Sequence, residues 1–346
     1  MKIAVLGGGH GAYAAAADLT EQGHEVRHWR RKASELSPVI QLLDEKGKRA
    51  VEVKAEKDIG NAVRQAELIL LPGPATAQMD IARAMAPHVS DGQVVFLPPG
   101  TFGSYAMAQV VTRKLLWAET GTLPWLARKR GPSEVAITIR AVRLPTGVYP
   151  VREQEKALAV IRKAFACVHP CGNALSGALM NAGPIIHPPL ILMNAGPLEA
   201  RSDYDIHNEG TQPAVRAVTD RLDAERIAIR EALGFAAPHY PLKDHYTSDR
   251  WMYGDAHQQL VKSGDWREPI DLHTHRYVTE DIELGLAFLA SVARWAGGEA
   301  PITDGLLAVA GGFLGRDLRR GPRTLEALGL ASLTRQALQQ LLHEGE

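Results

Sequence analysis

The chain opens on a short apolar run that turns into glycines and then into an alanine-rich segment, and this feature constrains the fold most. Residues 2–7 read KIAVLG, residues 8–19 read GGHGAYAAAADL, and residues 25–29, EVRHW, again have the composition of a strand. Strand, glycine turn, helix and strand in close succession form a βαβ unit. A parallel α/β sheet is therefore expected at the N-terminus.

The glycine turn carries the spacing of a dinucleotide-binding fingerprint, Gly7-x-Gly9-x-x-Ala12. The first glycine permits the tight turn, the second lets the backbone approach a pyrophosphate, and the small third residue lets the helix pack on the strand. The phosphates would lie at the helix N-terminus. The alternative is a glycine turn without a nucleotide. We expect cofactor contacts from Gly7, Gly9, His10, Gly11 and Ala12.

The end of the second strand indicates which nucleotide is used. An acidic residue there would bind the ribose 2′-OH of NAD, but this chain has Arg30, Arg31 and Lys32. Guanidinium groups bind a 2′-phosphate through charge-assisted hydrogen bonds. The sequence thus favours NADP(H) over NAD(H), with a solvated basic turn as the alternative.

Further strands alternate with helical segments along the first half. Residues 66–75 and 93–104 each read as a strand that runs into a Pro/Gly turn, residues 134–150 as two short strands or one long one, and residues 152–165 as an amphipathic helix. Turns at the carboxyl ends of such strands bind ligands. We therefore expect the turns at 72–76 and 98–104 to line the cofactor cleft, including Pro72, Pro99 and Gly100.

Helical periodicity replaces the strand pattern after about residue 175. Helices are expected over 211–235, 281–297 and 301–315. The architecture predicted is an α/β N-terminal Rossmann domain, residues 1–172, which binds NADP(H). An all-α C-terminal domain, residues 173–346, would hold the substrate and a dimer surface, with the active site between the two domains.

Composition excludes several classes of partner. The 346 residues carry a formal net charge of zero, with no basic block that would bind nucleic acid. We expect no transmembrane helix and no signal peptide, and hence a cytoplasmic protein. Cys167, His169 and Cys171 have the spacing of half a metal site, but no second ligand cluster accompanies them. No metal and two reduced cysteines are expected.

One imidazole stands alone in an apolar segment. His187 is the only ionisable side chain of GPIIHPPLILMNAG, residues 183–196. It is either a core histidine that satisfies both nitrogens locally or a catalytic group.

Five blocks of the chain resemble the opine dehydrogenase family: AETGTLPWLAR (118–128), MNAGPIIHPPLILMNAGPLE (180–199), GTQPAVRAVTDRLDAERIAI (210–229), RYVTEDIELGLAFLASVA (276–293) and RTLEALGL (323–330). The resemblance implies the reductive condensation of an α-keto acid with the amino group of an amino acid, with hydride delivered to an imine. It also implies a homodimer, a catalytic pair formed by His187 and Asp281, and Arg276 as the residue that binds the keto-acid carboxylate.

The residue types suit that chemistry independently. A histidine can supply a proton near neutral pH, a carboxylate on its other nitrogen orients it, and an arginine fork binds a carboxylate. The alternatives are that Asp281 is a capping or first-turn acid at a helix start and that Arg276 makes a surface ion pair.

Other candidates are less distinctive. Asn194 and Asn181 could bind substrate or form turns, and Thr211 could bind substrate or cap a helix. Trp251, Tyr253 and Trp266 could wall the amino-acid pocket.

Two segments depart from the family pattern, PPGTFGS at 98–104 and EDIELGL at 280–286, so the substrate pair stays open. Two other functions also remain: a 2-hydroxyacid dehydrogenase that needs no amine, and a non-catalytic NADP(H)-binding sensor.

Overall fold

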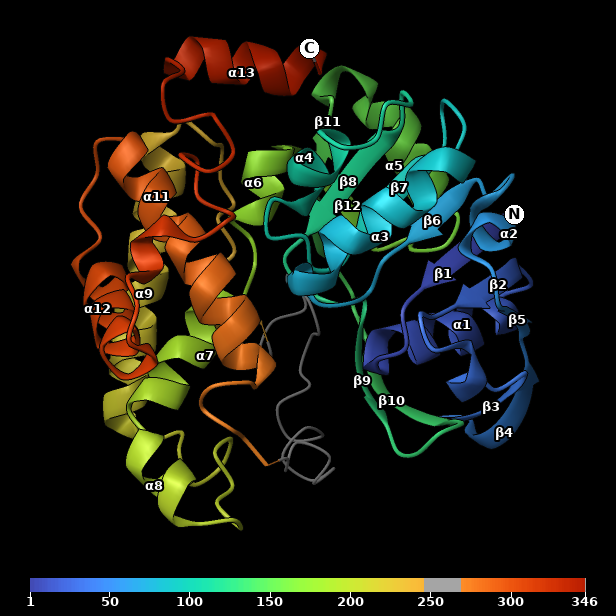
Figure 1. The fold of residues 1–346 in the computed structure, drawn as a ribbon, viewed down its shortest axis with the longest axis horizontal. Helices are drawn as coiled ribbons and strands as arrows, with labels where there is room; N and C mark the ends of the chain where they lie inside the picture. Colours follow the sequence, from blue (N-terminus) through green and yellow to red (C-terminus); the bar gives the residue numbers. More distant parts are fainter. Residues whose placement is uncertain (246–268, 346) are drawn as a thin grey trace.

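The computed structural model describes residues 1–245 and 269–345, and its first half is built on an eight-stranded sheet (Figure 1). The strand order is β12-β11-β8-β7-β6-β1-β2-β5, and every neighbouring pair is parallel except β8 and β11. The strands are β1 (Lys2–Leu6), β2 (Glu25–Trp29), β5 (Lys54–Glu56), β6 (Leu68–Leu70), β7 (Val94–Leu97), β8 (Leu116–Thr120), β11 (Leu144–Tyr149) and β12 (Val168–Asn173).

Helices cover this sheet because its central strands are apolar on both faces. All residues of β6 and β7 are buried, as parallel strands between helical layers require. The covering elements are α2 (Ile59–Val63), α3 (Gln78–Met85), α4 (Gly103–Ala108) and α5 (Gln154–Arg162), with the short 3₁₀ turns η1 (Ala33–Glu35), η2 (Ala75–Ala77), η3 (Ala86–His88) and η4 (Val151–Glu153).

A second, four-stranded sheet, which the sequence did not predict, packs against helix α1 (His10–Glu21). Its order is β4-β3-β10-β9, formed by β3 (Val39–Asp44), β4 (Gly47–Glu52), β9 (Trp125–Lys129) and β10 (Glu134–Arg140). Helix α1 contacts strands of both sheets, and its alanines are fully buried. A helix enclosed in this way needs small residues around its circumference, not an apolar stripe. The segment 134–150 accordingly divides into two strands, β10 and β11, of different sheets.

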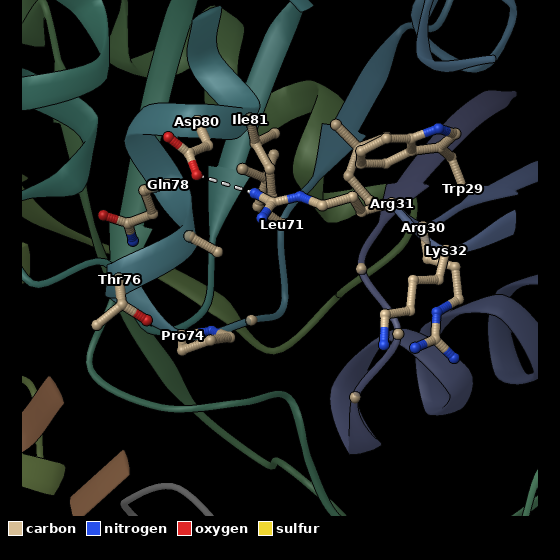
Figure 2. A pocket seen from close by; sticks show the side chains of 16 residues that line it. Trp29, Arg30, Arg31, Lys32, Leu71, Pro74, Thr76, Gln78, Asp80 and Ile81 are labelled. Carbon is tan, nitrogen blue, oxygen red and sulfur yellow. Dashed lines mark hydrogen bonds and ion pairs between the residues drawn. The ribbon is translucent and has the colours of Figure 1, made fainter. Parts of the chain in front are cut away.

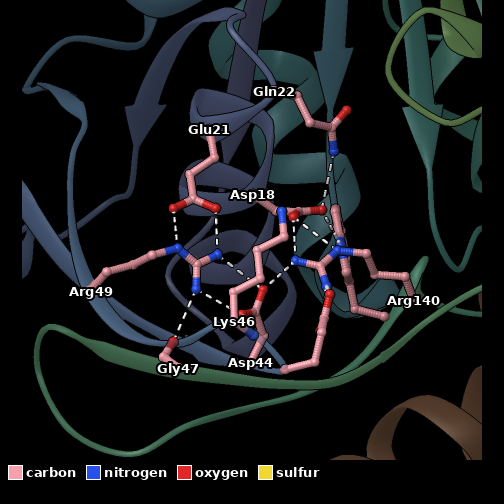
Figure 3. A network of polar contacts seen from close by, with 10 residues as sticks. Asp18, Glu21, Gln22, Asp44, Lys46, Gly47, Arg49 and Arg140 are labelled. Carbon is pink, nitrogen blue, oxygen red and sulfur yellow. Dashed lines mark hydrogen bonds and ion pairs between the residues drawn. The ribbon is translucent and has the colours of Figure 1, made fainter.

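Ion pairs fasten the second sheet to α1 (Figure 3). Arg140 donates to Asp18 on α1 and to Asp44 at the end of β3, both at 2.7 Å. Arg49 on β4 pairs with Asp44 and with Glu21 at the end of α1. These guanidinium contacts hold the pKa of the Asp44 carboxyl well below its usual range.

The second half is helical, and no strand follows Asn173 within residues 174–245 and 269–345. It contains α6 (Ala174–Ala178), α7 (Gly183–Leu192), α8 (Ala195–Ala200), α9 (Pro213–Ala232), η5 (Leu242–Asp244), the π-helix η6 (Tyr277–Leu286), α11 (Ala287–Trp295), α12 (Pro301–Leu314), η7 (Leu318–Arg320) and α13 (Arg335–Glu344). The predicted fold, a Rossmann domain followed by a helical domain, is confirmed.

Two helices show how the sequence sets these elements. Helix α9 begins at Pro213, buries Val215, Leu222 and Ile229 on one side, and is followed by Gly234 at φ +79°, as the pattern over 211–235 predicts. The helix expected from residue 281 begins at Tyr277 instead and has π geometry over its first ten residues.

Helix α13 returns from the helical domain to the first domain (Figure 1). Arg152 in η4 donates to Glu344 at 2.6 Å, and Leu338 and Leu342 of α13 are buried. Among the described residues, no helix has both the length and the apolar character needed to cross a membrane.

Candidate active site

A cavity of about 440 Å³, here called the glycine-turn cavity, opens at the carboxyl ends of β1, β2 and β6 (Figure 2). Gly7 has φ +146°, which a residue with a side chain rarely adopts, and a Cβ on Gly9 would meet open space. The turn therefore leaves room for a ligand at the start of α1. The lining residues are Leu6, Gly7, Gly8, Gly9, Trp29, Arg30, Arg31, Lys32, Leu71, Gly73, Pro74, Thr76, Ala77, Gln78, Asp80 and Ile81.

The three basic residues predicted to select the nucleotide all line this cavity, and each has an acidic neighbour. Arg31 pairs with Asp80 of α3 at 2.9 Å (Figure 2), and Glu35 pairs with both Arg30 and Lys32. The guanidinium of Arg30 lies so close to Gly8 that a Cβ there would overlap it. An anion in the cavity would therefore meet positive charge beside the glycine turn.

The other predicted cofactor residues have different environments. His10 accepts a hydrogen bond from the backbone N–H of Lys129 at 2.8 Å, so its ring is turned toward β9. A Cβ on Gly11 would collide with Leu123 and with the carbonyl oxygen of Pro72, which explains the glycine by packing.

Ala12 packs beside Gly7. Pro72, Pro99 and Gly100 do not line the glycine-turn cavity, although the neighbours Gly73 and Pro74 do. Gly100 packs against Glu119, with no room for a Cβ.

His187 and Asp281, 94 residues apart in the chain, meet in the helical domain. Nδ1 of His187 lies 2.7 Å from Oδ2 of Asp281. The side chains are 13% and 4% exposed. Gly183, one turn before the histidine, has no room for a Cβ because the other oxygen of Asp281 occupies that position. The alternative for Asp281, a capping or first-turn acid, is wrong, since Asp281 is the fifth residue of η6 and lies beyond its first turn.

An aromatic ring that the sequence did not single out fixes the orientation of the imidazole. Tyr277 stacks on His187 with ring centroids 3.6 Å apart and planes 12° apart. Its hydroxyl lies 3.1 Å from Nε2 of His207. The stack and the carboxylate together restrict rotation of the His187 ring.

Burial raises the pKa of Asp281 above its usual range. Burial also raises the pKa of the adjacent Glu280, and the negative charge of Asp281 acts in the same direction. Burial thus makes each of these two neighbouring carboxyls easier to protonate than an exposed carboxyl.

Arg276 stands at the start of η6, beside this group. Its guanidinium lies 4.9 Å from the centre of the Tyr277 ring and 3.8 Å from Oε2 of Glu280, and its side chain is 45% exposed. The three residues that the resemblance groups together are therefore close in space.

The remaining candidates are held within the fold. The amide of Asn194 donates to the carbonyls of Leu190 and Gly210 and accepts from Tyr204, which favours the turn-forming alternative. The hydroxyl of Thr211 donates to the carbonyl of His207 at 2.8 Å. The residue at the N-cap position of α9 is Gln212, so the alternative that Thr211 caps this helix is wrong.

Trp251, Tyr253 and Trp266 lie outside the described residues. Cys167 and Cys171 are free, and burial raises the pKa of both thiols to about 11.

Two contacts place the histidine pair at the carboxyl edge of the main sheet. Glu280 accepts a hydrogen bond from the backbone N–H of Ala75, in the turn after β6. Asn181, just before α7, donates to Thr101 in the turn after β7 at 2.8 Å. The two turns expected to line the cofactor cleft, 72–76 and 98–104, thus contact the domain that carries the histidine, and only the first of them lines the glycine-turn cavity.

Comparison with known proteins gives the same two-part division. Residues 170–314 match the model of the NAD/NADP octopine/nopaline dehydrogenase α-helical domain, and residues 2–101 match the N-terminus of NAD-dependent glycerol-3-phosphate dehydrogenase. The chain is 29% identical to an opine dehydrogenase of Arthrobacter sp. (strain 1C), with 96% of each chain covered. It is 23% identical to an octopine dehydrogenase of Mizuhopecten yessoensis, with 91% and 90% covered.

Solved structures share the whole fold. Octopine dehydrogenase in complex with NADH and agmatine superposes with a TM-score of 0.72 at 18% identity, covering 100% of this chain and 98% of the other. Yersinopine dehydrogenase with bound NADP⁺ gives a TM-score of 0.64 at 15% identity, covering 99% and 98%.

Proposed function

We propose that the chain is an NAD(P)-dependent oxidoreductase of the opine dehydrogenase family, and that it joins an α-keto acid to the amino group of an amino acid by reductive condensation. The observation that carries the proposal is the hydrogen bond of 2.7 Å between His187 and Asp281 at the edge of the sheet. The relatives named for this activity cover nearly the whole chain.

In the proposed reaction the amine and the keto acid lose water to form an imine, and reduction adds a hydride to carbon and a proton to nitrogen. His187 supplies that proton from Nε2, the nitrogen turned away from Asp281. Asp281 holds the ring and stabilises the imidazolium. In the reverse direction the same histidine accepts the proton.

The glycine turn fits a dinucleotide cofactor, because Gly9 leaves its surface open and Gly8 admits the guanidinium of Arg30. When bound, the reduced nicotinamide supplies the hydride. We propose NADPH over NADH, with the 2′-phosphate held by Arg30, Arg31 and Lys32 in place of Glu35 and Asp80. Replacing both Arg30 and Arg31 by alanine should shift the ratio of kcat/KM toward NADH; an unchanged ratio contradicts this assignment.

Arg276 is proposed to bind the keto-acid carboxylate, since its guanidinium lies beside η6 and remains 45% exposed. A cytoplasmic location and a homodimer complete the proposal. Size-exclusion chromatography with light scattering tests the dimer, and a monomeric mass contradicts it.

A substrate matrix tests the reaction. Oxidation of NADPH is followed at its absorbance band with each of several α-keto acids, alone and with each of several amino acids and amines. Turnover that needs both partners, with the secondary amine identified by mass spectrometry, is the expected result. Equal turnover without amine would instead indicate a 2-hydroxyacid dehydrogenase. Tight NADPH binding without turnover would indicate a sensor.

A further inference from the structure

We propose that Glu280 is a positioning residue that fixes the loop at residues 72–78 relative to the His187–Asp281 pair. The inference rests on the proposed function, because it concerns how the cofactor side and the proton-donating side of one reaction are held together. It assigns to Glu280 a role that acts through the backbone of Ala75.

The π-helix η6 carries two acids in succession that face different partners. Oδ2 of Asp281 lies 2.7 Å from His187, whereas Oε1 of Glu280 accepts the backbone N–H of Ala75 at 2.8 Å. Consecutive side chains leave a helix roughly a quarter turn apart, so one turn of backbone reaches both partners. The spacing between the histidine and the loop is then set by adjacent residues, not by the distant connection between the domains.

The loop that contains Ala75 borders the glycine-turn cavity. Ala75 is the first residue of η2, which continues directly into α3. Its neighbours Pro74 and Thr76 both line the cavity. A bond to the N–H of Ala75 therefore fixes the backbone between two cavity-lining residues.

Arg323 holds the same loop from a second point in the helical domain. Its Nη2 donates to Oε1 of Gln78 at 3.0 Å and to the carbonyl of Ala75 at 3.4 Å. The amide of Gln78 in turn donates to the carbonyl of Gly100 at 2.9 Å. Arg323 is only 4% exposed, so these contacts are shielded from water.

A contribution to stability does not by itself explain a buried carboxyl at position 280. Glu280 is 3% exposed, and replacing buried charged contacts with apolar packing is often neutral or stabilising. Geometry gives a stronger reason, since hydride and proton must reach adjacent atoms from different domains. An error of about 1 Å in such an arrangement can lower the rate by roughly 10².

The test removes the Glu280–Ala75 bond from each end. Glu280→Ala deletes the acceptor, Glu280→Gln keeps an amide oxygen that accepts the same N–H, and Ala75→Pro deletes the donor without altering η6. Proline is compatible with the first position of a helical turn, and the extended conformation of Pro74 suits a following proline. Glu283→Ala is the matched control, because Glu283 lies on the same helix and pairs with Arg316 at the surface.

Two readouts are measured: kcat and KM for the best substrate pair, and hydrogen–deuterium exchange of the peptide that spans residues 72–85. We expect Glu280→Ala to lower kcat on the order of 10²-fold and to speed exchange of the loop about tenfold, as loss of one buried hydrogen bond implies. Glu280→Gln should recover most of both effects. Ala75→Pro should resemble Glu280→Ala, and the double variant should be no slower than either single variant.

Equal loss of kcat in the Ala and Gln variants with unchanged exchange would overturn the proposal, as would full additivity of Glu280→Ala and Ala75→Pro. If the wild-type protein turns over no substrate pair, the proposed function fails. The exchange measurement still tests whether Glu280 fixes the loop at residues 72–78. Unchanged exchange in Glu280→Ala overturns that proposal.

Discussion

His187 shows how far sequence alone reaches at the scale of a residue. The resemblance assigns it together with Asp281 and Arg276, and the structure brings the three together. It could not assign Tyr277 or Glu280 their roles. Those roles depend on contacts with α7 and with a loop about 200 residues away, which no local pattern encodes.

Replacing His187 by glutamine is expected to lower kcat by about 10²–10⁴, the usual contribution of a general acid or base. The affinity for NADPH should stay within about threefold, because the ring lies on the helical side and not in the glycine-turn cavity. Steady-state kinetics and a fluorescence titration of NADPH measure the two effects. His343→Gln, at an exposed position of α13, is the control. A parallel loss of NADPH affinity would show that His187 is structural.

The buried carboxyl of Glu119 is expected to make the stability of the protein depend on pH. Burial raises its pKa from 4.5 to about 7, although it accepts hydrogen bonds from the backbone of Phe102 and Ser104. Between these values the folded state keeps a proton that the unfolded state has lost, so stability falls as pH rises. Relative to that of the Glu119→Gln variant, the free energy of unfolding of the wild-type protein should fall by up to about 3 kcal/mol between pH 4.5 and pH 7.5.

Urea denaturation of both proteins across that range measures the difference. Other titrating groups are common to the two proteins and cancel. Parallel stability curves would contradict a raised pKa for Glu119.

At the scale of elements, strands with a markedly apolar composition could be predicted from the sequence, whereas the pairing of strands that lie far apart in the chain could not. The buried strands β1, β6 and β7 are apolar runs that end in turns, and the sequence identifies them. The second sheet was missed because β3 and β4 mix polar and apolar residues and because β3 pairs with β10, about 90 residues on. The π geometry of η6 was missed because its apolar spacing resembles that of an α-helix.

Gly183 and Gly305 form a matched pair that tests the packing of α7 against η6. A Cβ at Gly183 would overlap the carboxylate of Asp281, whereas a Cβ at Gly305 in α12 meets nothing within 4 Å. Gly183→Ala should therefore displace Asp281 and lower kcat by roughly 10².

Gly305→Ala should stabilise the protein by about 0.4–1 kcal/mol through the unfolded state, with unchanged activity. Kinetics and urea denaturation of both variants check the pair. Full activity in Gly183→Ala would show that the carboxylate tolerates the displacement.

At the scale of the whole molecule, the order of the two domains follows from the change of periodicity near residue 175. The return of α13 to the first domain does not, because docking depends on surfaces formed by distant segments. Leu338 and Leu342 have the spacing of a single apolar face, which identifies a helix but not its partner.

Leu342→Ala is expected to destabilise the protein by about 2–5 kcal/mol, the cost of a cavity at a buried leucine. Leu342 is 1% exposed and belongs to the large apolar core. Gln340→Ala, at an exposed position of the same helix, should change stability by less than about 0.5 kcal/mol. Urea denaturation measures both. A Leu342 variant as stable as the wild-type protein would show that α13 docks only loosely.

The adjacency of Glu280 and Asp281 also limits how chains of this kind can diverge. Inserting or deleting one residue before them in η6 would rotate both carboxylates together, so one contact cannot be lost by such a change while the other survives. New substrate preferences are therefore expected to evolve through the surrounding loops, while the length of this helix stays constant.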